Sequence, residues 1–322
     1  MPSSPTRTAS ASSPRTHAVF LALVAAVVAL LLHSATLTAA AAATRGGSHP
    51  GVESVGQLLQ QSPTVADVEV QPWSAAINAS ASGLVVSQVS FVIKSTQRSF
   101  QGFLGTVVNP AFFKYALPSV GCGHRVNTSV TAKQNNCLFA TNAGFFDVNT
   151  GACIGNIVID GKTVEAAVTA RVNFGLQGQR SFITGYLDQS DVQSGKYNLT
   201  QLLTGAGWLV RDGKSYLDTS RYTESLDSNF VTEKAPRTSI GTFANGTMAI
   251  FVVDGEEDIG TGVDLYEFTE ILLDLGLTNA INLDGGGSSA VFYNNTIIDR
   301  PTCNDTPVIC ERAVTSITCV LP

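Results

Sequence analysis

A chain of 322 residues is long enough for one large domain or two small ones, so its length leaves the domain count open. The formal charge of −6 and the 14% content of charged residues exclude a basic stripe of the kind that binds nucleic-acid phosphates. Hydrophobic residues make up 44% of the chain, and glycine and β-branched residues are frequent, which predicts a globular domain with a well-filled, β-rich core.

Residues 1–45 have the pattern of a targeting segment. Arg7 and Arg15 precede an apolar run from Ala18 to Leu32, and small residues follow as far as Ala43. This order is typical of a signal peptide, and an uncleaved N-terminal anchor is the alternative. Residues 18–38 are the one stretch from which we expect membrane association. We therefore expect a protein of the secretory pathway, either in the Golgi or endolysosomal lumen or secreted.

The cysteines and glycosylation acceptors agree with that compartment. An even number of cysteines, six, follows the leader and suits three disulfides in an oxidising environment. The cysteines are Cys122, Cys137, Cys153, Cys303, Cys310 and Cys319. There are also six Asn-X-Ser/Thr acceptors. They are Asn78, Asn127, Asn198, Asn245, Asn294 and Asn304.

Residues 46–120 are interpreted as a lead-in and the N-terminal part of the domain. At most one short helix, Val52 to Gln61, is expected before the first strand. Alternating apolar residues predict a strand from Leu84 to Val92. The pairs Val107-Val108 and Phe112-Phe113 indicate further strands. The core of the domain is then expected over residues 121–322.

Three turn signals in the core predict β-hairpins. Asp160-Gly161, Asp212-Gly213 and Asn245-Gly246 each lie between two apolar runs, and these dipeptides favour tight hairpin turns. The three segments share turn chemistry without a fixed period, so they do not predict a repeat array.

One helix is predicted with both of its ends. Leu265 to Leu275 carries apolar residues at helical spacing, Asp264 suits the N-cap, and Gly276 suits the C-terminal end. Strands are expected at Ala280 to Leu283 and at Ala290 to Tyr293. The predicted fold class is α+β: a mixed, largely antiparallel β-sheet core with hairpins and a few packed helices, braced by disulfides.

The residue inventory excludes several chemistries. His124 is the one histidine after the lead-in, which excludes a His-Glu-X-X-His zinc site and disfavours a histidine triad; we interpret it as a loop residue. Oxidised cysteines would supply no thiol nucleophile. An acidic segment from Asp254 to Asp258 lacks EF-hand spacing and fits a solvated loop. No cofactor is predicted, and a metal requirement stays open.

The segment from Asn282 to Ser288 is the leading site candidate. Asp284 follows a predicted buried strand and precedes three glycines, whose backbone can approach a polar ligand and present N–H groups to an anion. A tight turn capped by Asp284 is an equal alternative.

Two further segments could line a site. Asn142, Gly144 and Phe146 could form a sugar-facing wall, although a strand end with core phenylalanines fits the same residues. Arg237 enters an otherwise apolar strand and requires an anionic partner, either a carboxylate such as Asp254 or Asp284, or a bound phosphate.

Taken in order, these segments and their neighbours resemble the phosphodiester glycosidase family over roughly residues 121–320. The segments are Cys137 to Phe146, Cys153 to Asn156, Thr184 to Leu187, Gln201 to Gly205, Trp208 to Arg211, Arg237 to Gly241, and Asn279 to Ser288. Ala143 departs from the family's usual Asn-Gly-Gly followed by Tyr or Phe, and Phe145 carries no hydroxyl, so no tyrosine acid is expected there.

The resemblance implies a hydrolase that removes α-linked N-acetylglucosamine from a phosphodiester, such as a covered mannose 6-phosphate, and leaves a phosphomonoester. The partner would be a phosphoglycan or glycoprotein glycan. Asp284 would stabilise the oxocarbenium-like sugar or activate water, with Asp254 as the second carboxylate. Arg237 would offset the charge on the leaving phosphate. The implied substrate-binding residues are Asn142, Gly144, Phe146, Gly285, Gly286 and Ser288.

The resemblance also suggests the bridges Cys122–Cys153, Cys137–Cys319 and Cys303–Cys310. Two other functions stay open at this point: the same fold acting on another surface or wall glycan, and a non-catalytic glycan-binding module. The oligomeric state is not predicted.

Overall fold

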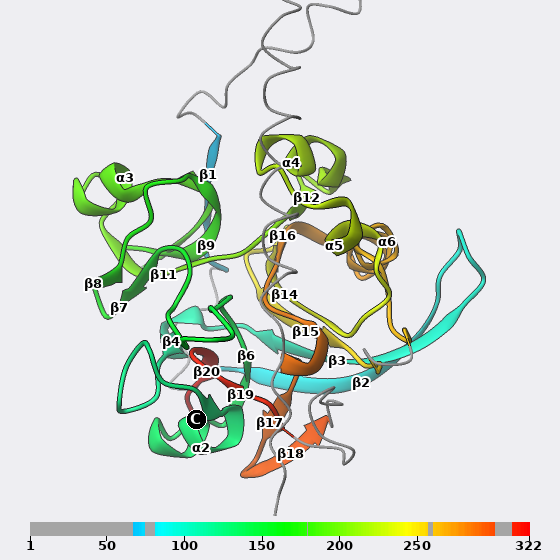
Figure 1. Cartoon of the computed structure of the whole chain (residues 1–322), viewed down its shortest axis with the longest axis horizontal. Coiled ribbons are helices and arrows are strands. Elements are labelled where there is room, and N and C mark those ends of the chain that lie inside the picture. The colour runs from blue at the N-terminus through cyan, green and yellow to red at the C-terminus, as the bar shows by residue number, and fades with distance from the viewer. Residues whose placement is uncertain (1–66, 75–80, 179, 257–259, 300–310) are drawn as a thin grey trace, which may run out of the picture. The chain divides into compact units, whose positions relative to one another are not determined.

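The computed structural model describes residues 67–74, 81–178, 180–256, 260–299 and 311–322 (Figure 1). All of them lie in the second of two compact units, Leu59–Pro322. The predicted leader, the helix at Val52 to Gln61 and the bridge Cys303–Cys310 fall outside the described residues. Within the described ranges, no helix is both long and apolar enough to cross a membrane.

Three antiparallel sheets form most of this unit (Figure 1). The six-stranded sheet has the order β1 (Val68–Pro72), β10 (Ser181–Leu187), β9 (Arg171–Gln177), β11 (Leu199–Thr204), β7 (Ile157–Ile159) and β8 (Lys162–Glu165). The seven-stranded sheet has the order β13 (Lys214–Ser215), β12 (Trp208–Arg211), β16 (Leu277–Asn282), β14 (Arg237–Phe243), β15 (Met248–Val253), β3 (Ser99–Val107) and β2 (Leu84–Val92). The five-stranded sheet has the order β18 (Thr296–Asp299), β17 (Val291–Tyr293), β6 (Phe139–Asn142), β20 (Ile317–Val320) and β4 (Phe113–Ala116).

Short helices and one small ladder complete the described fold. The ladder pairs β19 (Ala313–Val314) with β5 (Val126–Asn127). The helices are α2 (Thr128–Gln134), α3 (Gln189–Gln193), α4 (Leu217–Thr223), α5 (Ser228–Thr232) and α6 (Leu265–Asp274), with 3₁₀ turns at Pro110–Phe112 and Gly286–Ser288. The predicted α+β class with largely antiparallel sheets is confirmed.

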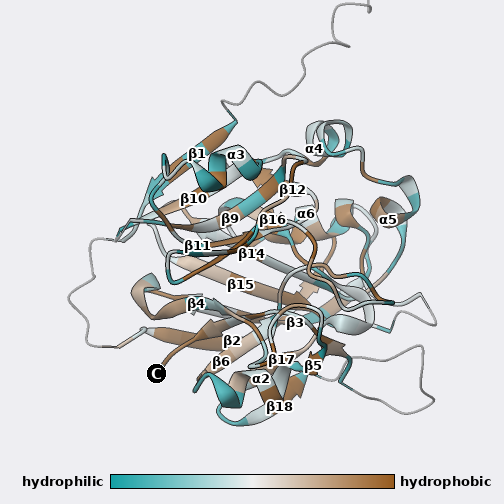
Figure 2. Cartoon of the chain, turned by 60° about the vertical axis from the view of Figure 1, so that its left-hand side comes forward, coloured by the Kyte–Doolittle hydropathy of each residue, from teal (hydrophilic) through white to brown (hydrophobic). Residues whose placement is uncertain are grey.

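The alternation of side chains along β14 and β15 sends neighbouring residues to two of the four core clusters of the described residues. On β14 and β15, Ile240 and Val252 belong to a central cluster that joins all three sheets, with Trp208 and Phe174. The adjacent Val253 belongs to a second cluster, in which α6 packs against the other face of the seven-stranded sheet. Figure 2 shows the hydrophobic strands of these sheets. This division decides which way each residue at the strand ends points.

Two predicted hairpins are confirmed with the expected turn geometry. Asp160 and Gly161 have φ of 49° and 75° between β7 and β8, and Asp212 and Gly213 have φ of 51° and 67° between β12 and β13. Positive φ at both central residues gives the twist that joins two antiparallel strands.

The third predicted hairpin, β14–β15, is also confirmed, but its turn is longer. Only Gly246 has positive φ there, at 77°, among the described turn residues, and the Phe243 N–H donates to the Thr247 carbonyl (2.9 Å). Asn245 accepts the Thr247 N–H (3.0 Å) instead of adopting positive φ.

The predicted helix is confirmed as α6. Asp264 accepts the Glu267 N–H (2.8 Å), and a capping box closes its first turn. Gly276, with φ of 88°, ends it. β16 then begins at Leu277, earlier than the predicted strand.

The region before residue 120 was only partly predicted. β2 has the predicted bounds, Leu84–Val92. Val107 is the last residue of β3, whose Gly102 and Gly105 interrupt the apolar pattern. Phe112 belongs to a 3₁₀ turn instead of a strand, because Pro110 starts that turn and Asn109 caps it (3.2 Å).

Two of the three implied disulfides are present. Cys122–Cys153 closes a sequence separation of 31 residues, and Cys137–Cys319 closes one of 182. The second bridge joins the segment that leads into β6 to the neighbouring strand β20, and thus holds the last strand in the five-stranded sheet.

Candidate functional site

Two predicted site segments meet where β6 and β16 end. The Asn142 amide Nδ2 donates to the backbone carbonyl of Asp284 (2.5 Å), although the two residues are 142 apart in sequence. The Asp284 N–H donates to the Ala143 carbonyl (2.9 Å), and the Leu283 N–H donates to the Thr238 carbonyl (2.8 Å). The ends of β6 and β16 and the start of β14 therefore form one junction that carries Asp284.

Asn142 is fully buried in this junction. Its Oδ1 accepts the Thr238 hydroxyl (2.9 Å) and the Ala290 N–H (3.3 Å), while its Nδ2 holds Asp284. The amide thus links three segments of the protein. This geometry gives Asn142 a direct part in holding the loop, and its orienting of a sugar stays a prediction.

The glycine loop packs against the first residues of β14. The Gly286 N–H donates to the Pro236 carbonyl (2.8 Å), and the Ser288 N–H donates to the Gly285 carbonyl (3.1 Å). A Cβ atom on Gly285 would lie 2.8 Å from the Pro236 carbonyl oxygen, so a side chain there would collide with backbone. The glycine loop therefore lies directly beside the backbone of Pro236 and Arg237.

The Arg237 side chain points to the α5–α6 side of the sheet. It is 2% exposed, its Nε donates to the Val263 carbonyl (3.2 Å), and its Nη2 donates to the carbonyls of Phe230 (3.1 Å) and Glu233 (2.8 Å). The Glu233 carboxylate lies 3.8 Å away. The Glu233 carboxylate and the carbonyl dipoles at the end of α5 thus supply part of the negative charge that Arg237 was expected to need.

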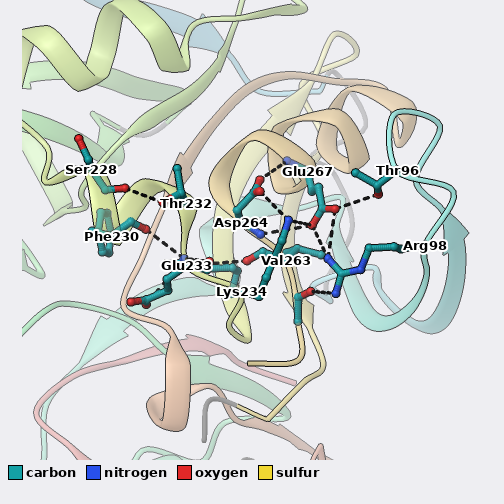
Figure 3. A network of polar contacts seen from close by, with 12 residues as sticks. Thr96, Arg98, Ser228, Phe230, Thr232, Glu233, Lys234, Val263, Asp264 and Glu267 are labelled. Carbon is teal, nitrogen blue, oxygen red and sulfur yellow. Dashed lines mark hydrogen bonds and ion pairs between the residues drawn. The ribbon is translucent and has the colours of Figure 1, made fainter. Parts of the chain in front are cut away.

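A charged network joins Lys234, which follows α5, to Asp264 and Glu267 at the start of α6 (Figure 3). Lys234 Nζ bonds Asp264 (2.6 Å) and Glu267 (2.8 Å), and Arg98 bonds the same Glu267 carboxylate (2.9 Å). Burial alone would raise the pKa of Glu267, but hydrogen bonds from Lys234, Thr96 and Arg98 outweigh it and hold that pKa below its usual value.

Asp254 lies at another place. Its side chain is exposed after β15, and its Oδ1 accepts the Gly255 N–H (2.7 Å). It borders a cavity of about 340 Å³ together with Ser90, Ser99 and Gln101. The structure therefore brings Asn142, Asp284 and the glycine loop together with the Arg237 backbone, and it places the Asp254 carboxylate at a separate cavity.

A different cavity, of about 350 Å³, lies beside the junction. It is lined by Phe145, Ile154, Arg171, Thr204, Gly205, Ala206, Ser225, Leu226, Asp227 and Phe230. Asp284 and Arg237 are close to this lining without belonging to it: Asp284 bonds Ala143, two residues before Phe145, and the Arg237 guanidinium lies 5.3 Å from the Phe230 ring centroid.

Two glycines allow the cavity walls to form. Gly155 has φ of 94°, and a Cβ there would lie 2.4 Å from Thr204 Cβ. A Cβ on Gly205 would lie 2.3 Å from the Asn282 carbonyl oxygen. The Cys153–Asn156 and Gln201–Gly205 segments can therefore approach one another and the end of β16 only without side chains at these positions.

Aromatic rings form one side of the cavity. Phe145 and Phe230 meet edge to face, with ring centroids 6.1 Å apart. Phe146, which was expected to face substrate, is 9% exposed and packs in the core cluster with Cys137 and Cys319. Its neighbour Phe145 is the aromatic residue of this segment that reaches the cavity.

Arg171 is the cation of the cavity, and sequence reasoning missed it. It begins β9, and within the described residues no carboxylate lies at salt-bridge distance from its guanidinium. The available signal was an arginine at the head of an apolar strand, the same signal that singled out Arg237.

A buried carboxylate lies behind this wall. Glu224 is 6% exposed and accepts the Ser220 hydroxyl (2.7 Å), the Gly207 N–H (3.2 Å) and the Val172 N–H (3.4 Å). Burial raises the pKa of Glu224, and these hydrogen bonds together with the charge of Arg171 oppose that rise. Glu224 thereby ties the end of α4 to β9, which carries Arg171, and to Gly207 in the segment before β12.

The arrangement suits a ligand with an apolar ring face and a negative charge. Aromatic rings contact sugar faces, Arg171 has no carboxylate of the described residues at salt-bridge distance and can bind a phosphate, and Asp284 supplies a carboxylate next to the cavity. Among the described residues, no three His, Cys, Asp or Glu side chains are grouped as a metal site would require.

Known proteins are similar to this chain in sequence and in fold. The phosphodiester glycosidase family model matches residues 135–321. The human N-acetylglucosamine-1-phosphodiester alpha-N-acetylglucosaminidase is 35% identical over 255 residues, which cover 74% of this chain and 49% of that protein. The bovine protein of the same name is 34% identical over 212 residues, which cover 62% of this chain and 40% of that protein. The chain thus spans about half the length of the curated relatives it matches.

Solved structures agree with the family match. The zebrafish N-acetylglucosamine-1-phosphodiester alpha-N-acetylglucosaminidase catalytic domain, described as auto-inhibited by its pro-peptide, superposes with a TM-score of 0.73 at 31% identity, covering 80% of this chain and 88% of that one. A hypothetical protein from Synechocystis, with a TM-score of 0.53 at 14% identity, covers 79% of this chain and 67% of that chain and shares the fold alone. The chain belongs to the phosphodiester glycosidase family.

Proposed function

We propose that this protein hydrolyses the bond between α-linked N-acetylglucosamine and a phosphodiester, and that it releases the sugar and leaves a phosphomonoester. The names of the human, bovine and zebrafish relatives support this activity. The observation that carries it is the cavity that Arg171 lines together with Phe145 and Phe230; Arg171 lies near the buried Glu224, but no carboxylate of the described residues is at salt-bridge distance from it.

The cavity provides the two kinds of contact that this substrate needs. The aromatic pair Phe145 and Phe230 would pack against the sugar ring, and Arg171 would bind the phosphodiester oxygens. Arg237 adds positive charge beside the glycine loop, from the α5 side. Arg171 would contact the leaving phosphate, and Arg237, which is buried and bonded to carbonyls at the end of α5, would act on the growing negative charge at a distance.

Bond cleavage then requires little acid assistance. The second pKa of a phosphomonoester is near 6, so the leaving group is stable as a dianion near neutral pH. It can therefore depart without being protonated when an arginine offsets its negative charge. Asp284, held at the junction by Asn142 and Ala143, is the proposed carboxylate that stabilises the oxocarbenium-like sugar or activates water. Asp254 stays the proposed second carboxylate, although it lies at another cavity.

The test is a direct assay with a small substrate, N-acetylglucosamine 1-phosphate esterified to methyl mannoside. We expect the purified protein to release N-acetylglucosamine, and Asp284→Asn to lower kcat at least about 100-fold, the usual scale for a catalytic carboxylate. Asp254→Asn, made in parallel, decides whether that carboxylate takes part.

The secreted yield and the unfolding temperature of both variants should equal those of the parent protein. A loss of activity can then be assigned to the reaction and not to misfolding. Two results would overturn the proposal: no hydrolysis by the parent protein, or full turnover by Asp284→Asn.

A further inference from the structure

The connector that joins α4 to α5 forms part of the rim of the cavity that Arg171 lines (Figure 1). Its residues Ser225, Leu226 and Asp227 all line that cavity. Ser225 and Asp227 are exposed, whereas Leu226 is half-buried and packs against the second core cluster. The middle residue therefore anchors the connector, and its two polar neighbours lie at the cavity in contact with solvent.

Backbone hydrogen bonds fix the connector to the end of α4. The Ser225 N–H donates to the Tyr222 carbonyl (3.3 Å), and the Leu226 N–H donates to the Arg221 carbonyl (2.9 Å). These two bonds form a Schellman motif, in which the residue that follows the C-cap adopts positive φ and is most often glycine. Ser225 occupies this position with φ of 51°.

Serine is an unusual residue at such a φ. Eight described residues other than glycine have positive φ, and six of them are asparagine or aspartate, which tolerate this region. The other two are Ser225 and Gln97. The Gln97 amide bonds the Lys94 carbonyl (2.8 Å) in the turn between β2 and β3, but no described residue bonds the Ser225 hydroxyl. Backbone strain kept at a cavity, with no local bond to account for it, indicates a functional side chain.

Asp227 has one carboxylate oxygen that no described residue bonds. Its Oδ1 accepts the N–H of Asn229 (2.8 Å) and of Phe230 (3.3 Å). Its Oδ2 has no hydrogen-bond donor among the described residues, and none of their cations lies within salt-bridge distance. Of the described residues that line the cavity, Asp227 alone carries a carboxylate. It therefore brings a hydrogen-bond acceptor to the cavity next to Phe230.

The other hydroxyl side chain of the lining is already engaged. Thr204 Oγ1 donates to Asn173 Oδ1 (2.7 Å) and accepts the Asn156 N–H (2.7 Å). Ser225 is thus the hydroxyl of the described lining that remains able to bind a ligand, and it lies two residues from the Asp227 carboxylate.

We propose that the Ser225 hydroxyl and the Asp227 carboxylate bind hydroxyl groups of the sugar and thereby determine which sugar the cavity accepts. The inference rests on the proposed function, because it assigns the recognition of the sugar within the same cavity. An aromatic pair contacts the ring face without reading its hydroxyl groups, and Arg171 binds the phosphate, so selectivity requires further polar groups. A sugar hydroxyl can donate to a carboxylate and accept from a serine hydroxyl at the same time.

Deoxygenated substrates test this assignment. They are three analogues of the methyl mannoside substrate, each of which lacks one hydroxyl group of the N-acetylglucosamine ring. Ser225→Ala and Asp227→Asn should each lower kcat/KM for the complete substrate about tenfold, the scale of one hydrogen bond. Asparagine still caps α5, so the second variant keeps its helix. For one of the analogues, each variant should match the parent, because the hydroxyl that the side chain binds is already missing.

Ser225→Gly separates recognition from folding. Glycine adopts positive φ without strain, so this variant should unfold at a higher urea concentration than the parent and still lose kcat/KM as Ser225→Ala does. The matched control is Gln97→Gly, which makes the same change of residue at positive φ in an exposed turn outside the cavity. Its kcat/KM should equal that of the parent.

The outcomes separate the two proposals. A parent protein that is inactive on the complete substrate overturns the proposed function. Parental kcat/KM in Ser225→Ala, Ser225→Gly and Asp227→Asn leaves that function standing and overturns the recognition of hydroxyl groups. A loss of the same size on the complete substrate and on all three analogues also overturns it, because these side chains would then act on the phosphate or on the fold.

Binding without turnover gives an independent readout. In an NMR titration with N-acetylglucosamine alone, the parent should bind the sugar more tightly than Ser225→Ala and Asp227→Asn do, and Gln97→Gly should bind it as the parent does. Equal binding by the parent and both cavity variants would overturn the proposal whatever the enzymatic result.

Discussion

Asn142 donates a hydrogen bond from its side-chain amide to the backbone carbonyl of Asp284 (2.5 Å), and this bond joins the end of β6 to the glycine loop. The relationship explains why two short motifs that lie far apart in the chain belong to one site. Asp284 owes its position to a buried amide and to the Ala143 carbonyl, which accepts its N–H. Hydrogen bonds to the backbone carbonyl and N–H of Asp284 therefore fix the position of the residue that supplies the carboxylate.

The first prediction concerns this amide. Asn142→Leu should lower the free energy of unfolding by about 2–3 kcal/mol, because it leaves buried partners on Thr238, Asp284 and Ala290 without their hydrogen bonds. Thr238→Val removes one of these bonds and should cost about 1 kcal/mol. Urea unfolding followed by circular dichroism measures both, and equal effects of the two changes would contradict the linking role of Asn142.

The second prediction concerns Arg171. Arg171→Gln should lower kcat/KM for a sugar phosphodiester about 10- to 100-fold, because a hydrogen-bonded charge pair with the phosphate is lost. Steady-state kinetics on the methyl mannoside substrate measure the change. Arg125→Gln removes an exposed arginine outside the cavity and serves as the control. An Arg171→Gln enzyme with parental kinetics would remove this residue from the phosphate site.

The third prediction compares the two disulfides. Loop-closure entropy grows with the logarithm of loop length, so the bridge Cys137–Cys319, with a separation of 182, constrains the unfolded chain more than Cys122–Cys153, with 31. Replacing the first pair by serine should cost about 1.5 kcal/mol more than replacing the second. Chemical denaturation of the two double variants checks the order, and a reversed order would show that local packing outweighs loop length.

The fourth prediction is an acid-side loss of stability. The folded-state pKa of Glu267 lies below its ordinary value of 4.5, so its contribution is complete above pH 4.5 and is lost as pH falls through the folded pKa. Glu267→Gln should therefore destabilise the protein at pH 7 and reduce the fall in stability toward pH 3. Unfolding free energies measured at several pH values decide this, and an unchanged pH profile would argue against the Lys234–Glu267–Arg98 network.

The fifth prediction concerns Glu224, for which stability should change with pH in the direction opposite to that of Glu267. Burial raises the folded-state pKa of Glu224 above its ordinary 4.5, so the fold binds this proton more tightly than the unfolded chain does. Stability should fall as pH rises from 4.5 through the folded pKa, and Glu224→Gln should remove that part of the slope. The measurement is again the free energy of unfolding against pH, with Glu267→Gln as the contrasting variant.

Local patterns in the sequence predicted the local elements well. Asp160-Gly161 and Asp212-Gly213 marked their hairpins because φ above zero is accessible to these residues, and Asp264 and Gly276 marked both ends of α6. The elements that were missed lack such signals. Two glycines break the apolar pattern of β3, and α5, with five residues, is too short for a helical period to appear.

The candidate site was predicted in part. Asp284, Asn142 and the glycine loop were singled out by residue type, and the structure brings them together. The same reasoning chose Phe146, whereas the turn after β6 directs Phe145 to the cavity and Phe146 to the core. It did not choose Arg171, because a single arginine at a strand start has no spacing that identifies its neighbours.

The sequence by itself determined the antiparallel α+β class, the hairpin turns and the motif that carries Asp284, because each depends on residue types at short separation; the order of such motifs along the chain indicated the family. Only the tertiary structure decided that Asn142 holds Asp284, that the Arg237 side chain turns toward α5, and that Phe145, Arg171, Gly205 and Phe230 share one cavity. These contacts join residues from separate strands and helices, and the register of the sheets sets which side chains face one another.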